Sequence, residues 1–511
     1  MKRIPLIDDA FLRLETRRMP LHIGVLMLFE PPAGAGKNFA EDIASRLRQQ
    51  IKTAPPFNQC LVQHRGMHYW EEDADFDLDQ HFVHLSLPAP GRIRELLALV
   101  SRVHPGHLDR AYPLWRMYLI EGINDGRIAV YLKIHHAMVD GVGGMKMLID
   151  SMAPDAKAST AMPPAWSIGA GKSRALQSLP VPNPAVEGIS ALRSLAREGV
   201  MSSAASVTKV LGVLRDTFRD IRRNNPNLTV AGQAPRCQFN GKISGSRRFA
   251  AQSYSMPRIK AVARAYQATS NDVILAMCGS ALRRYLEARN ELPDIPLIAS
   301  IPVSVRGKGQ QTDAANEVAF TMAHLATHLD DPLARLVAIK NCMDYNKQRM
   351  KQLSPGQLMT YEAVMMLPGA ANSLLGYAPD KALANVCISH VPGPRQDMYW
   401  QGAKLCGLYP VSLITDGGAL NITIVSRHDL VDFGIIACRK TVPDVQRLLE
   451  YLEQGLVEME DALARLSPPE TGPGARSKSR KTRSARTAAK TTRPKAKSKV
   501  LKAPAGRRAS L

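Results

Sequence analysis

The chain has 511 residues, 45% hydrophobic side chains and a formal net charge of +22. This length exceeds one ordinary hydrophobic core, so the sequence predicts two packed domains rather than a disordered chain. No apolar run reaches about 18 residues and no apolar signal region begins the chain, so we expect neither a transmembrane helix nor a secretory signal. Seven scattered cysteines without a CxxC pair do not favour a disulfide framework or a structural zinc site.

The first predicted domain spans 1–153 and is of the α/β class. A helix-like segment near Asp8–Arg17 precedes an alternating strand pattern over His22–Phe29. A second helical period covers Ile93–Val103, and Ile128–Ile134 has the alternation of a strand.

Residues 154–240 are predicted to form a crossover linker with an amphipathic helix. Apolar residues recur there at helical spacing, at Val207, Val210, Leu211, Leu214, Phe218 and Ile221. Packing of this helix on the body is the simpler interpretation. The neighbouring arginines also allow a membrane-facing role, and they are Arg215, Arg219, Arg222 and Arg223.

The second predicted domain, 241–466, mixes strands and helices and is again α/β. Its predicted strands are Leu297–Val305, Ala384–Ser389, Leu420–Ser426 and Val431–Ala437. Its predicted helices are Arg258–Tyr266, Asp272–Arg289, Pro332–Lys351 and Pro443–Leu466.

A low-complexity basic tail, 467–511, completes the chain and is predicted to be disordered. Fourteen Lys and Arg and no acidic residue lie from Thr471 onward, which leaves +8 for the rest of the chain. Anionic lipid head groups or nucleic acid are chemically suitable partners for such a tail. A purely solubilising role is the alternative.

The candidate chemistry lies in the run from His135 to Gly141. If strand geometry persists after Ile134, His136 continues the apolar Ile128–Ile134 face and His135 points to the other side. A histidine at the end of a buried strand suits a general base, because its pKa lies near physiological pH. Asp140 could brace the following loop or act on the imidazole, while a satisfied core pair or a metal-ligand pair is the alternative for the histidines.

No GxSxG elbow, phosphate-binding loop or GxGxxG fingerprint is present, so a covalent acyl-enzyme has no evident carrier. Direct attack of an activated hydroxyl on a thioester is then the simplest use of a buried histidine. Gly141, with Gly143 and Gly144, permits a tight turn before a helix over 142–152.

The run His135–Gly141 matches HHxxxDG, the signature of the acyltransferase superfamily related to chloramphenicol acetyltransferase. Further blocks occur in the order of the bacterial wax ester synthase/diacylglycerol acyltransferases, which the chain resembles from about residue 8 to 465. They are Asp9–Leu12, Glu15, Met19–Gly24, Pro113–Trp115, Asn271–Asp272, Ile301–Arg306, Val391–Pro394, Tyr409–Ser412 and Gly417–Ile422. His390 stands where this family usually has Asn.

This resemblance implies a two-domain chloramphenicol-acetyltransferase-like fold with an interdomain channel and His136 near its middle. It implies O-acyl transfer from acyl-CoA to a long-chain alcohol or diacylglycerol, with acyl-CoA as substrate and no cofactor or metal. Another HHxxxDG acyltransferase or a condensation enzyme is the alternative. We also expect a cytoplasmic protein associated peripherally with the inner membrane or lipid inclusions, and do not expect nucleic acid as a partner.

The resemblance also suggests supporting roles. Asp140 is expected to brace the loop, with Arg306 as its candidate partner, and Asn271 is a candidate oxyanion stabiliser. A helix N-cap with Asp272 complementing the dipole is the alternative for Asn271. Trp115 is expected to be architectural, and Met359–Ala378 to line an acyl tunnel, touch a membrane or form core helix.

Overall fold

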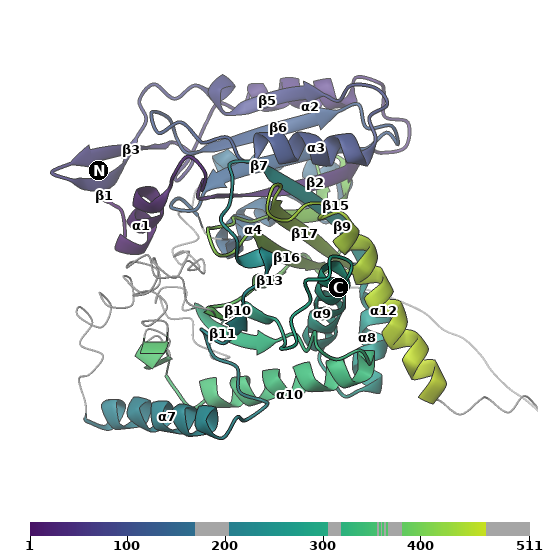
Figure 1. The fold of residues 1–511 in the computed structure, drawn as a ribbon. Helices are drawn as coiled ribbons and strands as arrows, with labels where there is room; N and C mark the ends of the chain where they lie inside the picture. Colours follow the sequence, from purple (N-terminus) through teal and green to yellow (C-terminus); the bar gives the residue numbers. More distant parts are fainter. Residues whose placement is uncertain are drawn as a thin grey trace, which may run out of the picture. The chain divides into compact units, whose positions relative to one another are not determined.

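Two mixed six-stranded sheets organise the protein, which we describe from a computed structural model (Figure 1). The described residues are 1–139, 141–168, 204–304, 318–354, 357–358, 360–361, 364–365 and 381–466. Met1–Leu466 forms one compact unit. The predicted tail, 467–511, lies outside the described residues.

The first sheet carries the histidine strand at its centre. Its strands run in the order β14 (Tyr399–Trp400), β15 (Ala403–Val411), β2 (His22–Glu30), β7 (Ile128–His135), β6 (Trp115–Glu121) and β5 (Phe82–Ser86). Every residue of β7 is buried, because β2 and β6 flank the strand and both faces of the sheet are covered.

The second sheet comes from the later part of the chain. Its order is β11 (Val318–His324), β10 (Ile298–Ser304), β13 (Val386–Pro392), β16 (Leu420–Arg427), β17 (Leu430–Cys438) and β9 (Arg247–Ser255). β13 pairs in parallel with both neighbours, whereas the remaining pairs are antiparallel. The predicted strands of this region therefore agree with the structure to within three residues at each end.

Helices cover both sheets. They are α1 (Leu6–Leu14), α2 (Phe39–Arg48), α3 (Ile93–Val103), α4 (Gly141–Asp150), α5 (Ala156–Ser159), α7 (Ala204–Arg222), α8 (Met256–Ala265), α9 (Ser270–Glu287), α10 (Pro332–Met350) and α12 (Arg447–Leu466). Short 3-10 turns occupy Leu78–Gln80, Ala165–Ser167 and Gln238–Asn240. None of these helices combines the length and apolar character needed to cross a bilayer.

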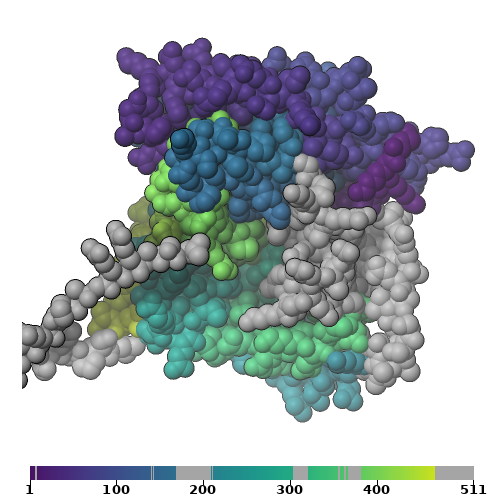
Figure 2. All heavy atoms as spheres, turned by 180° about the vertical axis from the view of Figure 1, so that it is seen from behind, coloured from purple at the N-terminus to yellow at the C-terminus, as the bar shows by residue number. Residues whose placement is uncertain are grey.

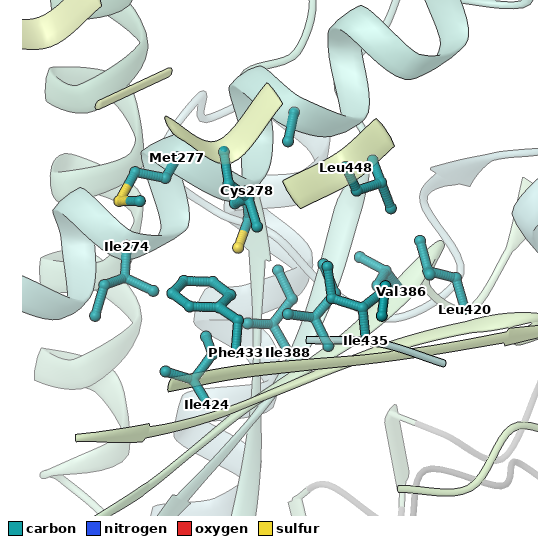
Figure 3. Packing of buried hydrophobic residues seen from close by; sticks show 14 of the residues in the cluster. Ile274, Met277, Cys278, Val386, Ile388, Leu420, Ile424, Phe433, Ile435 and Leu448 are labelled. Atoms are coloured by element: carbon teal, nitrogen blue, oxygen red, sulfur yellow. The ribbon is translucent and has the colours of Figure 1, made fainter. Parts of the chain in front are cut away.

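The main core lies between the second sheet and its helices. Figure 3 shows Ile274, Met277 and Cys278 of α9 facing Ile388 and Phe433 of the sheet. Because strand side chains alternate, the neighbours Cys387 and Ser389 face the other side of β13. That other side is where the candidate site lies.

Smaller sheets complete the fold. β1 (Lys2–Arg3), β4 (Met67–Glu72) and β3 (Gln59–His64) form one of them, and β12 (Lys381–Ala382) with β8 (Ala234–Pro235) forms the other. Figure 2 shows segment 141–168 (blue) against the green segment that contains β14, where Ala153 pairs with Tyr399.

β15 links the two sheets, because it comes from the later part of the chain yet pairs with β2 of the first sheet. The pairing shifts register between Leu405 and Gly407. At this bulge the buried pair Arg427–Asp432 of the second sheet holds the backbone of β15. Arg427 donates to the Cys406 carbonyl at 2.8 Å, and Asp432 accepts the Leu408 N–H at 2.9 Å.

β14 and β15 thus belong to the first sheet, although they lie within the residue range of the second predicted domain. The boundaries expected near residues 153 and 240 stay predictions.

Candidate active site

A largely apolar cavity lies between the two sheets. Its first wall comes from β2, β7 and α4, and its second from β10, β13 and β16, with β15 contributing at the junction. Apolar lining residues include Ile23, Val25, Leu132, Ile134, Met145, Met147, Leu148, Val391 and Val411, and polar ones are His136, Ser389, Ser412, Asn421 and Thr423. An apolar lining with a few polar groups suits a ligand with a long hydrocarbon chain and one reacting centre.

His136 lines this cavity together with Leu132 and Ile134. Leu132 and Ile134 share one face of β7, and His136 directly follows the strand on the same side, so the placement predicted from strand parity is confirmed. The His136 N–H donates to the Leu21 carbonyl at 3.0 Å. Its ring stacks on Phe11 of α1, with centroids 4.5 Å apart and planes inclined by 23°.

The His136 ring is neutral at physiological pH. Burial, together with a smaller electrostatic contribution from His135, lowers its pKa to about 3 from an ordinary 6.5, against an opposing effect of its own backbone. Its Nδ1 makes no hydrogen bond with another described residue. A neutral imidazole facing an apolar cavity can accept a proton from a bound hydroxyl.

His135 faces away from the cavity and toward Glu15. Its Nδ1 accepts the Ala137 N–H at 3.1 Å, so a neutral ring carries its proton on Nε2. That Nε2 lies 3.6 Å from Oε1 of Glu15. The histidines therefore have different surroundings, one apolar and one beside a carboxylate.

Glu15 was not singled out for a role by the sequence reasoning, although it belongs to the opening block. Its side chain is 5% exposed and accepts the Leu21 N–H at 3.0 Å and Arg110 at 3.1 Å. Burial would raise its pKa, but His135, the Leu21 N–H and Arg110 together lower it to about 2. Leu21 thus joins the Glu15 carboxylate to the backbone of His136.

Comparisons with known proteins assign this arrangement to a family. The model of the wax ester synthase/diacylglycerol acyltransferase catalytic domain matches residues 5–274, and the model of the C-terminal domain matches 314–460. The chain belongs to the wax ester synthase/diacylglycerol acyltransferase family. It is an O-acyltransferase, as the resemblance implied.

Two curated relatives cover nearly the whole acyltransferase. The O-acyltransferase WSD of Acinetobacter baylyi is 42% identical over 91% of this chain and 98% of its own length. A putative diacylglycerol O-acyltransferase of Mycobacterium tuberculosis is 43% identical over 89% of this chain and 99% of its own.

Solved structures agree with the two-sheet fold. The wax ester synthase/diacylglycerol acyltransferase of Marinobacter aquaeolei has a TM-score of 0.74 and 39% identity, with 91% and 100% of the two chains covered. The first condensation domain of the calcium-dependent antibiotic synthetase has a TM-score of 0.55 at 14% identity, over 91% of this chain and 96% of its own. The latter likeness concerns the fold alone.

The remaining residues of the HHxxxDG block are only partly described. Gly141 lines the cavity where α4 begins. A Cβ on Gly144 would lie 3.3 Å from Cγ1 of Val139, so the turn is tightly packed there. Asp140 and Arg306 lie outside the described residues, and the brace expected from them stays a prediction.

Asn271 of the acyltransferase does not line the cavity with His136. Its Oδ1 lies 3.4 Å from Nδ1 of His390, whose Nε2 contacts the Ser426 hydroxyl at 2.7 Å. His390 occupies the α9 side of β13, whereas Ser389 faces the cavity. The helix is capped by Thr269 instead, which accepts the Asp272 N–H. The oxyanion role of Asn271 stays a prediction.

The block Pro113–Trp115 supports the histidine strand. Trp115 is 1% exposed, and its Nε1–H donates to the Phe57 carbonyl at 2.8 Å. The Leu114 carbonyl accepts the His135 N–H at 2.8 Å. The burial expected of the Trp115 ring is therefore confirmed, and its architectural role stays a prediction. The described residues contain no group of three or more His, Cys, Asp or Glu side chains placed to share a metal ion.

Proposed function

We propose that this acyltransferase moves a long-chain acyl group from acyl-CoA to a fatty alcohol, to diacylglycerol, or to both, with His136 as general base. The observation that carries the proposal is a buried His136 in the wall of an apolar cavity between the sheets. An apolar wall accommodates both hydrocarbon chains, and the imidazole meets the only group that must lose a proton.

The proposed reaction has two steps. His136 takes the proton of the alcohol hydroxyl as the oxygen attacks the thioester carbonyl, which gives a tetrahedral oxyanion. The oxyanion then collapses, the C–S bond breaks, and His136 returns the proton to the departing thiolate of CoA. Burial lowers the pKa of His136 to about 3, so the ring is unprotonated before the first step and can receive the proton of the hydroxyl.

Phe11 and Glu15 act as positioning residues in this proposal. Phe11 holds the face of the His136 ring, and Glu15 fixes the Leu21 backbone on which His136 is anchored. Neither side chain transfers a proton to substrate.

A substrate panel tests the proposed function. Purified protein is incubated with palmitoyl-CoA and either hexadecanol or dipalmitoylglycerol, and both free CoA and ester are quantified. We expect one ester for each CoA released with at least one acceptor, and unchanged turnover after dialysis against EDTA, since no metal or cofactor enters the proposed reaction. CoA release without ester formation with both acceptors would refute acyl transfer to these alcohols.

The substrates also suggest where the enzyme works. Long-chain alcohols, diacylglycerol and their esters are poorly soluble in water, so they reside at lipid surfaces. We therefore propose that the protein associates peripherally with membranes or lipid inclusions, without a nucleic-acid partner.

A further inference from the structure

Among the described residues, one face of α7 packs on the body. Val213, Leu214 and Thr217 are buried, and the first two contact Leu353 and Leu358. The predicted apolar stripe is therefore divided in the structure, because two of its members point away from the body. Leu211 is 58% exposed and Phe218 is 53% exposed.

Four exposed residues of α7 form a line along the helix. Positions 211, 215, 218 and 222 are separated by four, three and four residues, which places them along one side of a helix. This line reads Leu, Arg, Phe, Arg, and all four side chains are exposed. No other helix in the described ranges exposes two large apolar side chains. We call this line the outer face of α7.

The helix that carries this outer face is strongly basic, together with Arg223 just beyond its end. Between Ala204 and Arg223 the sequence has five Lys and Arg but two Asp. Asp216 pairs with Arg219 at 2.9 Å and more distantly with Arg215 at 3.8 Å. The other three cations make no side-chain hydrogen bond or ion pair with a described residue, and they are Lys209, Arg222 and Arg223.

An apolar cavity lies directly behind α7. Val213 lines it from the helix, Phe320 and Met322 from β11, and Met350 from α10. In both Figure 1 and Figure 2, α7 lies at the lower edge of the molecule, remote from the first sheet. From the segment Met359–Ala378, the described residues Tyr361 and Met365 also line this cavity.

We propose that the outer face of α7 docks on an anionic phospholipid surface. Leu211 and Phe218 enter the boundary between head groups and acyl chains, while the arginines meet lipid phosphates. Alternating apolar and cationic side chains match this partner, because a lipid surface offers both an apolar layer and negative charge. The inference rests on the proposed function, which requires access to water-insoluble substrates.

The depth to which α7 inserts into the bilayer distinguishes docking through α7 from binding through the basic tail. The full chain carrying Phe218→Trp is mixed with phosphatidylglycerol vesicles that contain a brominated-chain phosphatidylcholine, and Trp fluorescence is recorded. Ile295→Trp is the matched control, since Ile295 is 45% exposed and lies outside α7. The four native Trp are at most 7% exposed and supply a common background, and they are Trp70, Trp115, Trp166 and Trp400.

We expect bromine to quench the fluorescence of the Phe218→Trp variant well above the background and to leave that of the Ile295→Trp variant at background. Equal quenching of the two variants would overturn the proposal, because the tail alone would then hold the protein at the surface. If the Phe218→Trp variant is quenched equally on vesicles without anionic lipid, the assignment of an anionic lipid surface as the partner would be overturned.

Partitioning provides a second measure. We expect Leu211→Ser with Phe218→Ser to lower the vesicle partition coefficient by about tenfold or more, and Val337→Ser with Ile295→Ser to leave it unchanged. Acyl transfer in detergent micelles should be equal in all variants.

Two kinds of outcome separate the docking face from the proposed function. If the Phe218→Trp protein is quenched as expected but neither it nor the wild type forms ester, only the proposed function is refuted. A double variant that stays active and binds vesicles as the wild type does would refute the docking face but not the proposed function. A double variant that loses self-association but still binds vesicles would have the same meaning.

Discussion

Replacing Glu15 by Gln removes one negative charge from behind His135 and His136 while keeping the shape of the side chain. The carboxylate is 5% exposed and has a pKa of about 2 against an ordinary 4.5. This difference corresponds to about 3 kcal/mol of preference for the ionised form in the folded protein. We expect Glu15→Gln to lower the free energy of unfolding at pH 7 by about 3 kcal/mol or somewhat less, because the amide oxygen can still accept the Leu21 N–H.

The sign of the pH dependence follows from a depressed carboxylate pKa. The contribution of Glu15 is fully present above pH 4.5 and is lost as the pH falls toward 2. The stability difference between wild type and Glu15→Gln should therefore shrink to about half at pH 3. Urea unfolding at the two pH values measures this stability difference. The control is Asp344→Asn, because the Asp344 side chain is 44% exposed and loss of its pair with Lys340 is expected to lower the unfolding free energy by under about 1 kcal/mol.

Glu15→Gln should also affect kcat more than KM, because it displaces the backbone that anchors His136 and leaves the cavity wall intact. Restoring the charge with Glu15→Asp should recover part of kcat. A loss of stability below about 1 kcal/mol at pH 7, or one that does not change with pH, would refute the role of the buried carboxylate.

Two further changes test how the site is held. Asp432→Asn leaves Arg427 buried without its counterion at the β15 bulge, and we expect a loss of about 3–5 kcal/mol in unfolding free energy by urea titration; a loss under about 1 kcal/mol would contradict the link between the sheets. Phe11→Ala removes the ring stacked on His136, and we expect about 3–5 kcal/mol of destabilisation together with a fall in kcat. Phe11→Leu keeps most of the side-chain volume, so it should restore stability more fully than kcat. Full activity of Phe11→Leu would show that ring stacking does not position the histidine.

Much of the site could be predicted because local patterns determine it. Alternation along Ile128–Ile134 places His136 in the cavity wall, and this survives in the structure because β7 stays a regular strand to His135. The helix over Ile93–Val103 was predicted with the bounds that the structure gives, since a strong amphipathic period coincides with clear ends.

Contacts between distant parts of the chain could not be predicted in this way. Glu15 and His135 are brought together only because the segment after α1 turns back along β7, and no local pattern records that path. The same holds for β15, which pairs with a strand that lies several hundred positions earlier in the chain. The exposure of Leu211 and Phe218 likewise depends on which face of α7 finds a partner, whereas periodicity reports only that an apolar face exists.

The sequence shows that His390 stands in place of the family's usual Asn, but it does not show which residues surround His390 in the fold. Its partly buried ring contacts Asn271 and Ser426 on the α9 side of β13, and desolvation lowers its pKa. Which side of the strand it occupies follows from parity with Ile388 once the sheet is known.

The most direct measurement of the central claim is CoA release from palmitoyl-CoA and hexadecanol by His136→Ala. The control is His64→Ala, which makes the same change at an exposed position of β3. We predict a loss of roughly 10²-fold or more for His136→Ala, in line with the contribution of a general base, and wild-type turnover for His64→Ala. Turnover within about threefold of wild type in folded His136→Ala protein would contradict the proposed role of His136 as the base.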